Sequence, residues 1–424
     1  MSATTVAVLS LVLMLLLIWG GLHVAVVLGL VSFVGVWIIR DDIGVAANLL
    51  AQASSDAIAS HIFGVVPLFV LTGFLVARAD IGKDAFEVAN QLFRRLRGGL
   101  GVATVASNAV FAAITGISIA SAAVFTRVAV PQMMRFGYQP KFAVGVVAGS
   151  SVLGMLIPPS LLMILYGFLA NQSVGDLFTA GIVLAAYFKP SMVYAGGEMP
   201  VPDGEDMSPL TMVLKLVPIV LMIGGVLGGL YGGLFTATEA GAVGAALALL
   251  IAVLRRKLTA RAFWEVLTET GHVTVAVSFL IICASIYTRM LAMSGMPQFL
   301  MELISHAGFG PFAFMLVYVF IIVLLGTVID SSSILLIVLP LMLPIAEQFG
   351  MDLIWFGVVT VVAVETGLLT PPFGLSAYVV KSSLNDPRIT LGDIFRGTGP
   401  FTLIMVGVLL LLMAFPSLSL VLLK

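Results

Sequence analysis

Two short stretches that interrupt helices constrain the fold of this chain more than any other feature. The segments GSSVLGMLIPPS (149–160) and VETGLLTPPFG (364–374) each lie in an apolar run long enough to cross a bilayer. Each carries glycine and a Pro-Pro pair, which a continuous helix tolerates badly. The second pair follows the first at an interval of half the chain length. We therefore place one helix break in each half, at Pro158, Pro159, Pro371 and Pro372.

Other residues that punctuate helices repeat at the same interval. A gapless shift that places Pro158 on Pro371 also pairs Gly82 with Gly295, Phe86 with Phe299, Ser118 with Ser331, Pro131 with Pro344 and Gly154 with Gly367. Chance supplies one or two such pairs but not a whole register of them. The pattern therefore predicts an internal repeat of the kind found in secondary transporters.

Basic residues in the loops give the two halves opposite orientations. The stretches 94–97 and 135–141 are basic in the first half, and the positions that the same shift pairs with them in the second half are not. The reverse holds for 255–261, which is basic only in the second half. Because cytoplasmic loops carry the excess of Lys and Arg, equivalent loops should lie on opposite faces of the membrane. We expect an inverted repeat with both termini outside the cytoplasm.

The composition fits a membrane protein and excludes several other classes. Hydrophobic residues make up 60% of the chain and charged residues 10%, whereas soluble domains are about 25% charged. The basic residues fall in loops rather than in one patch, which argues against a nucleic-acid partner. The single cysteine, Cys283, excludes an intramolecular disulfide and a multi-cysteine metal site, and we expect it to be a buried core residue. The chain is predicted to be an all-α polytopic membrane protein.

Two apolar regions, 98–134 and 311–347, are too long for one crossing and have small, polar centres. Both loops that flank 98–134 are basic, so this segment must enter the membrane and return to the cytoplasmic side. We interpret it as a re-entrant hairpin with its tip near 116–121, and 311–347 as its mirror image with its tip near 326–333. Such tips persist at membrane depth only where protein or a water-filled cavity covers them.

These features give a complete division of the chain. The first repeat, 1–188, is expected to contain scaffold spans within 6–77, an amphipathic arm at 81–97, the hairpin 98–134 and a broken helix at 142–172. A polar linker, 189–209, separates the halves. The second repeat, 210–424, is expected to contain scaffold spans within 210–292, an arm at 293–305, the hairpin 311–347, a broken helix at 355–385 and a final span at 399–422.

Helix breaks offer a ligand the backbone N–H and C=O groups that have lost their helical partners. The side chains that could join them are Ser118, Ser121, Ser150 and Ser151 in the first half, and Thr327, Asp330, Ser331, Ser332, Ser333, Glu365, Thr366 and Thr370 in the second. Hydroxyls and carbonyls with at most one nearby carboxylate suit sodium better than a transition metal.

The carboxylates within the membrane have two possible roles. An unpaired charge at that depth costs about 2.5 kcal/mol or more, so Asp330 and Glu365 are candidates for ion binding. Each could instead cap a helix or pair with a structural partner, and for Glu365 the two interpretations are equally favoured. For Glu239 we expect a scaffold hydrogen bond rather than ion binding.

Several segments together resemble the large membrane subunit of TRAP transporters, the tripartite ATP-independent periplasmic carriers. They include ITGISIASAAVFTRVAVPQMMRFGYQPKFAVG, GMLIPPSLLMILYG, GGLYGGLFTATEAGAVGA, VIDSSSILLIVLPLMLPIAEQFGMD and ETGLLTPPFGLSAYVV. The resemblance implies an elevator-type transporter, similar to the ion transporter superfamily, in the bacterial inner membrane. It implies sodium-coupled, binding-protein-dependent uptake of a small organic acid, with no catalytic residues and no cofactor other than Na⁺. Two partners are implied, a small four-helix membrane subunit and a periplasmic substrate-binding protein.

The resemblance also places an ion site at each hairpin tip and the break that faces it. The matching residues here are Gly116, Ser118, Ser121, Ser150, Ser151 and Gly154 in the first half, and Asp330, Ser331, Thr366, Gly367 and Thr370 in the second. One departure affects the first tip, where the family usually has Gly-Ser-Ser and this chain has Gly116-Ile117-Ser118. One hydroxyl is therefore missing from that tip.

Three alternative functions stay open from the sequence. A stand-alone sodium-dicarboxylate symporter of similar fold would work without a binding protein. A channel would conduct regardless of the direction of the sodium gradient. An integral membrane enzyme would need a titratable nucleophile or a metal cluster, and the sequence offers no such cluster.

Overall fold

A computed structural model describes residues 2–59, 64–96, 98–187, 207–384, 386–421 and 423, and these residues form helices, turns and short connections. The first half contains α1 (Ala3–Trp19), α2 (Val24–Arg40), α3 (Ile43–Ala59), α4 (Val65–Arg78), α5 (Ile81–Phe93), α6 (Gly99–Thr115), α7 (Ser118–Arg135), α8 (Pro140–Ser151), α9 (Leu153–Leu156), α10 (Leu161–Ala170) and α11 (Val174–Tyr187). The predicted linker 189–209 lies mostly outside the described residues.

The second half contains α12 (Pro209–Ile223), the π-helical turn η3 (Gly224–Gly228), α13 (Gly229–Tyr231), α14 (Ala237–Leu254), α15 (Ala260–Ser294), α16 (Met296–His306), α17 (Pro311–Gly326), α18 (Ser331–Gln348), α19 (Leu353–Leu369), α20 (Leu375–Leu384), α21 (Leu391–Ala414) and α22 (Ser417–Leu420). Within the described ranges, six helical segments are long and apolar enough to cross a membrane, and the pair α4 and α5, bent by 61°, would make a seventh. The all-α membrane architecture predicted from the composition is confirmed.

The predicted order of hairpin and broken helix occurs in both halves. Helices α6 and α7 form the first hairpin, whose tip is Gly116-Ile117, and α17 and α18 form the second, whose tip spans 327–330. The first broken helix runs from α8 through α9 to α10, and the second from α19 to α20. Both Pro-Pro bonds, Pro158-Pro159 and Pro371-Pro372, are cis and lie in these breaks.

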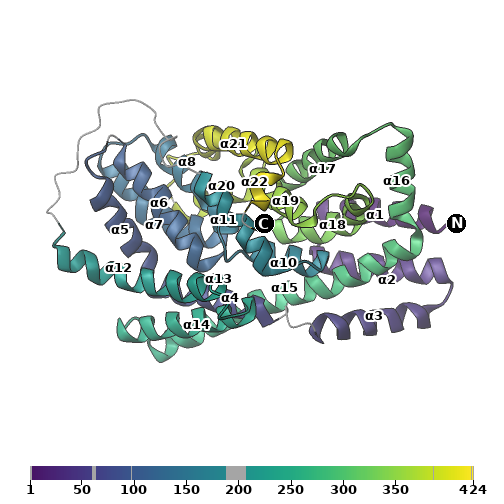
Figure 1. The fold of residues 1–424 in the computed structure, drawn as a ribbon, viewed down its shortest axis with the longest axis horizontal. Coiled ribbons are helices and arrows are strands. Elements are labelled where there is room, and N and C mark those ends of the chain that lie inside the picture. The colour runs from purple at the N-terminus through teal and green to yellow at the C-terminus, as the bar shows by residue number, and fades with distance from the viewer. Residues whose placement is uncertain are drawn as a thin grey trace.

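The hairpins lie at opposite ends of the molecule. Figure 1 shows α5, α6 and α7 at one end, α16 and α17 near the other, and the broken helices between them. Helices α12, α14, α15, α2 and α3 run along one long side of this assembly (Figure 1). This arrangement places the two hairpin tips toward the centre, beside the helix breaks.

Helix α3 is an element that the sequence reading missed. Its sequence, IGVAANLLAQASSDAIA, is rich in alanine, serine and other small or polar residues, so its mean hydropathy is too low for the length rule that identified the other spans. It packs on α2 and α15, and Arg289 of α15 donates to Asp56 at its C-terminal end over 2.5 Å. Helix α15 extends over 35 residues and ends just beyond the predicted scaffold region 210–292.

The predicted arm at 81–97 forms α5, and it is fixed on both of its sides. Most of its apolar face is buried, although Leu92 and Leu96 remain exposed. On its polar side the Asp84 carboxylate pairs with Arg255 of α14 and lies 3.6 Å from Nζ of Lys215 of α12. Glu87 pairs with the same lysine. The charged face of this helix therefore binds the neighbouring helices rather than an aqueous surface.

Candidate ion and substrate site at the hairpin tips

Each hairpin tip is hydrogen-bonded to the break that faces it. At the first tip, the Gly116 carbonyl accepts from the Leu161 N–H at the start of α10 over 3.3 Å. At the second tip, the Thr327 carbonyl accepts from the Gly374 N–H just before α20 over 3.2 Å. Leu161 and Gly374 are themselves a pair in the repeat register that aligns Pro158 with Pro371. In each half, a backbone N–H of the broken helix therefore donates to a carbonyl of the hairpin tip that faces it. The two donor residues, Leu161 and Gly374, occupy the same register position.

Glycines at equivalent positions allow the tips to approach the breaks closely. A Cβ on Gly154 would lie 2.7 Å from the backbone nitrogen of Ser118, and a Cβ on Gly367 would lie 2.7 Å from the Cα of Gly326. Contacts below about 3 Å to backbone atoms cannot be accommodated without a shift of the chain. Gly154 and Gly367 are predicted ion-site residues, and the structure shows that the hairpin backbones pack directly against them. Gly116 itself has φ +65°, a conformation that favours glycine.

Glu365 lies between the two tips and contacts both. Its side chain, on α19, is fully buried. The Ser118 hydroxyl at the start of α7 donates to Oε2 over 2.9 Å, and the Ser331 hydroxyl at the start of α18 lies 3.4 Å from Oε1. Ser118 and Ser331 are a repeat-related pair, and the structure brings them to opposite oxygens of a single carboxylate. The ion pairs found among the described residues do not include Glu365.

Buried oxygens without partners lie along the first hairpin. The hydroxyl of Ser121 and the Oδ1 of Asn108 are buried and have no hydrogen-bond partner among the described residues. The other side of the Asn108 amide donates to the Ser150 hydroxyl over 2.6 Å, and Ser150 donates to the Val146 carbonyl. Because buried polar atoms in native proteins nearly always have a partner, these two oxygens are free to coordinate a cation.

The second tip carries its own carboxylate. Asp330 is the N-cap of α18, where Oδ2 accepts from the Ser333 N–H over 3.1 Å and Oδ1 accepts from the Ser333 hydroxyl over 2.5 Å. The hydroxyls of Thr366 and Thr370 donate to carbonyls one turn back along their own helix, as that of Ser151 does in the first half. These three hydroxyls have their hydrogens engaged, and only their oxygen lone pairs remain available to a ligand.

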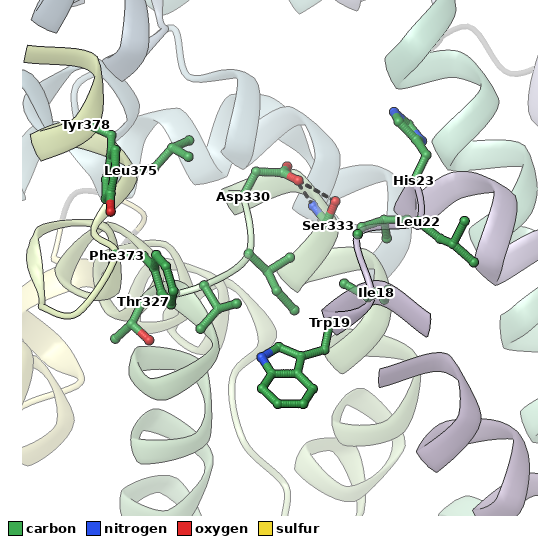
Figure 2. Close-up of a pocket in the computed structure, with 15 residues that line it drawn as sticks. Ile18, Trp19, Leu22, His23, Thr327, Asp330, Ser333, Phe373, Leu375 and Tyr378 are labelled. Atoms are coloured by element: carbon green, nitrogen blue, oxygen red, sulfur yellow. Dashed lines mark hydrogen bonds between the residues drawn. The ribbon is translucent and has the colours of Figure 1, made fainter. Parts of the chain in front are cut away.

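An open cavity of about 650 Å³ borders the second tip. Figure 2 shows Asp330 and Ser333 near its centre, with Trp19, Leu22 and His23 on one side and Phe373 and Tyr378 on the other. Residues 18–24, which join α1 to α2, supply the first wall, and the second break supplies the other. This volume lies within the range of small-molecule pockets, about 300–1,000 Å³.

The donors at these tips suit a hard monovalent cation. They are hydroxyl, amide and carboxylate oxygens together with backbone carbonyls, and no group of three or more His, Cys, Asp or Glu side chains in the described chain could hold a metal ion. Oxygen ligands of low total charge are typical of alkali and alkaline-earth ions rather than of transition metals.

Six of the predicted ion-site residues fall into three groups. Ser118 and Ser331 meet at Glu365, Gly154 and Gly367 support the tips, and Ser150 and Ser121 line the first hairpin. Glu239 forms a capping box with Thr236 at the start of α14, as expected for a scaffold hydrogen bond. The sequence reading missed Asn108 and the 18–24 wall of the cavity. Asn108 could have been found as an amide side chain inside a long apolar run, whereas the wall carries no signal short of the tertiary structure.

Known proteins decide the class to which this site belongs. Residues 11–418 match the family described as "Tripartite ATP-independent periplasmic transporter, DctM component". The chain belongs to this family. The resemblance to the large membrane subunit of TRAP transporters is thereby confirmed.

Relatives of this DctM-family chain extend over most of its length. It is 31% identical over 369 residues to the C4-dicarboxylate TRAP transporter large permease protein DctM of Pseudomonas aeruginosa. The aligned region covers 84% of this chain and 85% of that protein. It is 30% identical over 390 residues to the sialic acid TRAP transporter large permease protein SiaM of Vibrio cholerae, with 88% and 89% covered.

Solved structures of other transporters share the fold. The Alcanivorax borkumensis YdaH transporter superposes with a TM-score of 0.63 at 14% identity and covers 98% of both chains. Neisseria gonorrhoeae MtrF superposes with a TM-score of 0.60 at 11% sequence identity. That superposition covers 98% of this chain and 95% of the MtrF chain. The DctM-family chain is therefore a multi-pass permease subunit of the bacterial inner membrane, and not an enzyme. Large permeases of this family work with a small membrane subunit and a periplasmic binding protein, as the word "tripartite" in the family's description reflects.

Proposed function

We propose that this chain is the transmembrane subunit of a sodium-coupled importer of a small organic acid that a periplasmic binding protein delivers. The observation that carries the proposal is the convergence of Ser118 and Ser331, from two repeat-related hairpin tips, on the buried Glu365. In transporters, interrupted helices at mid-membrane are where substrate and coupling ions bind. The geometry thus joins two such interruptions in one site.

Sodium is the proposed coupling ion, with one site at each tip. In the first half, Ser121 and Asn108 offer oxygens that lack partners among the described residues, and the Asn108 amide also donates to the hydroxyl of Ser150. In the second half, Asp330 provides a carboxylate and the carbonyls of the break provide further ligands. A site with few formal charges favours a monovalent ion, because a divalent ion at this depth would need more carboxylates to balance it.

The proposed substrate is a small carboxylate. Two of the relatives are named for C4-dicarboxylates and for sialic acid, and a third, from Escherichia coli, for 2,3-diketo-L-gulonate. Each of these is an organic acid. The cavity beside Asp330 has a volume suited to a molecule of this size.

Transport would follow an elevator mechanism in an inverted repeat. The carrier would consist of the two hairpins and the two broken helices, α6–α10 and α17–α20. The scaffold would consist of the remaining long helices, and α5 and α16 would be the arms that join the two parts. The ion pairs that attach Asp84 to Arg255 and Lys215 fix the first arm to α12 and α14, which supports its assignment to the scaffold side.

The test is uptake by proteoliposomes that contain the chain together with its small membrane subunit and its binding protein. The acid to be labelled is first identified as the one that the purified binding protein retains. We expect uptake to require an inward sodium gradient and to fall to background when the binding protein is omitted. Equal uptake by the chain alone would support a stand-alone symporter, and uptake that ignores the gradient's direction would indicate a channel. Either result would contradict the proposal.

A further inference from the structure

The two repeats do not carry carboxylates at equivalent positions. Asp330, the N-cap of α18, corresponds to Ile117, and Glu365 corresponds to Val152. Both carboxylates of the central site therefore come from the second repeat. The first repeat has the same backbone plan and an aliphatic side chain at each of the two positions.

This difference leaves the first hairpin without a cap of its own. The N-cap of α18 is Asp330, whose side chain accepts from the Ser333 N–H. The N-cap of α7 is Ile117, at the same register position, in an extended conformation with φ −134° and ψ 113° and without a side-chain hydrogen bond to the helix. The first N–H groups of a helix need acceptors, and the positive end of its dipole favours an anion nearby.

Glu365 supplies a hydrogen-bond acceptor to that helix end from the other repeat. Its Oε2 accepts from Ser118, the first residue of α7, while its Oε1 faces Ser331, the first residue of α18. Two positive helix ends therefore share one fully buried carboxylate, and none of the ion pairs within the described ranges engages it.

We propose that Glu365 is a positioning residue that links the ion sites of the two hairpin tips by supplying the carboxylate that the first repeat lacks. This inference rests on the proposed sodium coupling. An ion that draws Ser331 or Ser118 into its own coordination changes the hydrogen bond that the other hairpin makes with Glu365. Occupancy of one tip therefore alters the arrangement of the other, and the two sodium ions bind cooperatively.

The test is equilibrium binding of ²²Na⁺ to the purified full-length chain, with sodium titrated against choline. The wild-type chain is expected to bind with a Hill coefficient close to 2. Glu365→Gln is expected to lower the coefficient to about 1 and to raise the half-saturating sodium concentration about tenfold, the effect of losing a hydrogen bond to a charged group. Glu347→Gln, an exposed carboxylate at the opposite end of α18, is the matched control and is expected to leave both values unchanged.

A second substitution separates this role from general destabilisation. Ile117→Asp gives α7 the cap that α18 already has, and the backbone at position 117 is extended as at Asp330. In the Glu365→Gln background it is expected to recover at least half of the lost sodium affinity without restoring cooperativity, since each hairpin then has its own carboxylate. Should Glu365→Gln not fold, Glu365→Asp keeps the charge but is one methylene too short to reach both hydroxyls, and it is expected to lose cooperativity.

The outcomes distinguish the inference from the function on which it rests. Absence of ²²Na⁺ binding to the wild-type chain would contradict the proposed sodium coupling. Cooperative binding by the wild-type chain that Glu365→Gln and Glu365→Asp leave unchanged would overturn the inference alone. Non-cooperative wild-type binding, or failure of Ile117→Asp to recover affinity in the Glu365→Gln chain, would also overturn it.

Discussion

The two hairpin tips contact their facing breaks in similar ways but differ in chemistry. Both rest on a glycine of the facing break, and both bond to the break at the same register position. The carbonyl of Pro159 lies against Gly116 of the first tip, and buried hydroxyl and amide groups line that hairpin. The second tip carries Asp330 and opens into a cavity of about 650 Å³. Similar packing of the two tips against their breaks therefore does not imply two equal sites.

The two halves share the residues that pack the tips against the breaks but not the residues that carry charge. The packing residues, such as Gly154 and Gly367, recur because both tips must approach a break at close range. The charged residues do not recur, because one buried carboxylate between two helix ends can serve both of them. A second unpaired carboxylate at the same depth would add a desolvation cost of about 2.5 kcal/mol or more.

The largest expected loss of stability and uptake comes from adding a side chain where a glycine of the break packs against a hairpin tip. Gly154→Ala and Gly367→Ala each place a Cβ 2.7 Å from a backbone atom of the hairpin, which should cost about 1–3 kcal/mol of stability and lower uptake at least tenfold. Thermal unfolding and proteoliposome uptake would measure both effects. Gly271→Ala, where nothing lies within 4 Å of the added atom, is the control and should be neutral or slightly stabilising. A tolerated alanine at either tip would show that the hairpin does not rest there.

Two substitutions of Asp330 separate the charge of its side chain from its role as the N-cap of α18. Asp330→Ala should cost about 1 kcal/mol through the lost cap, and Asp330→Asn should retain most of that stability. Both should raise the sodium concentration needed for half-maximal uptake, because both remove the carboxylate. Asp352→Ala removes the cap of α19 instead, and should lower stability by a similar amount without changing sodium dependence. Normal sodium dependence in Asp330→Asn would exclude the carboxylate from the ion site.

At the first tip, Asn108→Ala tests the oxygens that lack partners. The substitution removes Oδ1 and the hydrogen bond to Ser150, so we expect about 1 kcal/mol lower stability and a several-fold weaker sodium affinity. Thr104→Ala is the matched control, since its buried hydroxyl on the same helix bonds only to the Leu100 carbonyl. Equal sodium affinity in both variants would place the first ion elsewhere.

The smallest effect is expected at the cavity wall. His23→Asn alters the cavity wall that the residues joining α1 to α2 supply, which is not part of either hairpin. We expect a change of a few fold in the substrate concentration at half-maximal uptake, measured with the substrate-loaded binding protein, and no change in sodium affinity. An altered sodium affinity instead would mean that this wall belongs to the ion site.

Much of this architecture is predictable from the sequence, and the limits have physical causes. The Pro-Pro pairs are local signals, and the described helices are interrupted at both of them, between α9 and α10 and between α19 and α20. Helix α3 escaped because the hydropathy rule detects spans rather than helices. The contact of Glu365 with both hairpin tips could not be predicted from the sequence, because its partners, Ser118 and Ser331, are 247 and 34 residues away in the chain. Only the tertiary structure brings them together.

The central claim, that the two tips form one coupled site, is tested most directly by a double-mutant cycle on Ser118→Ala and Ser331→Ala. The measured quantity is the sodium concentration at half-maximal uptake in the wild type, each single variant and the double variant. Because both hydroxyls act on the same carboxylate, the double variant should deviate from the product of the single effects by about threefold or more. Single effects that multiply without deviation would mean that the tips bind their ions independently, and would contradict the account.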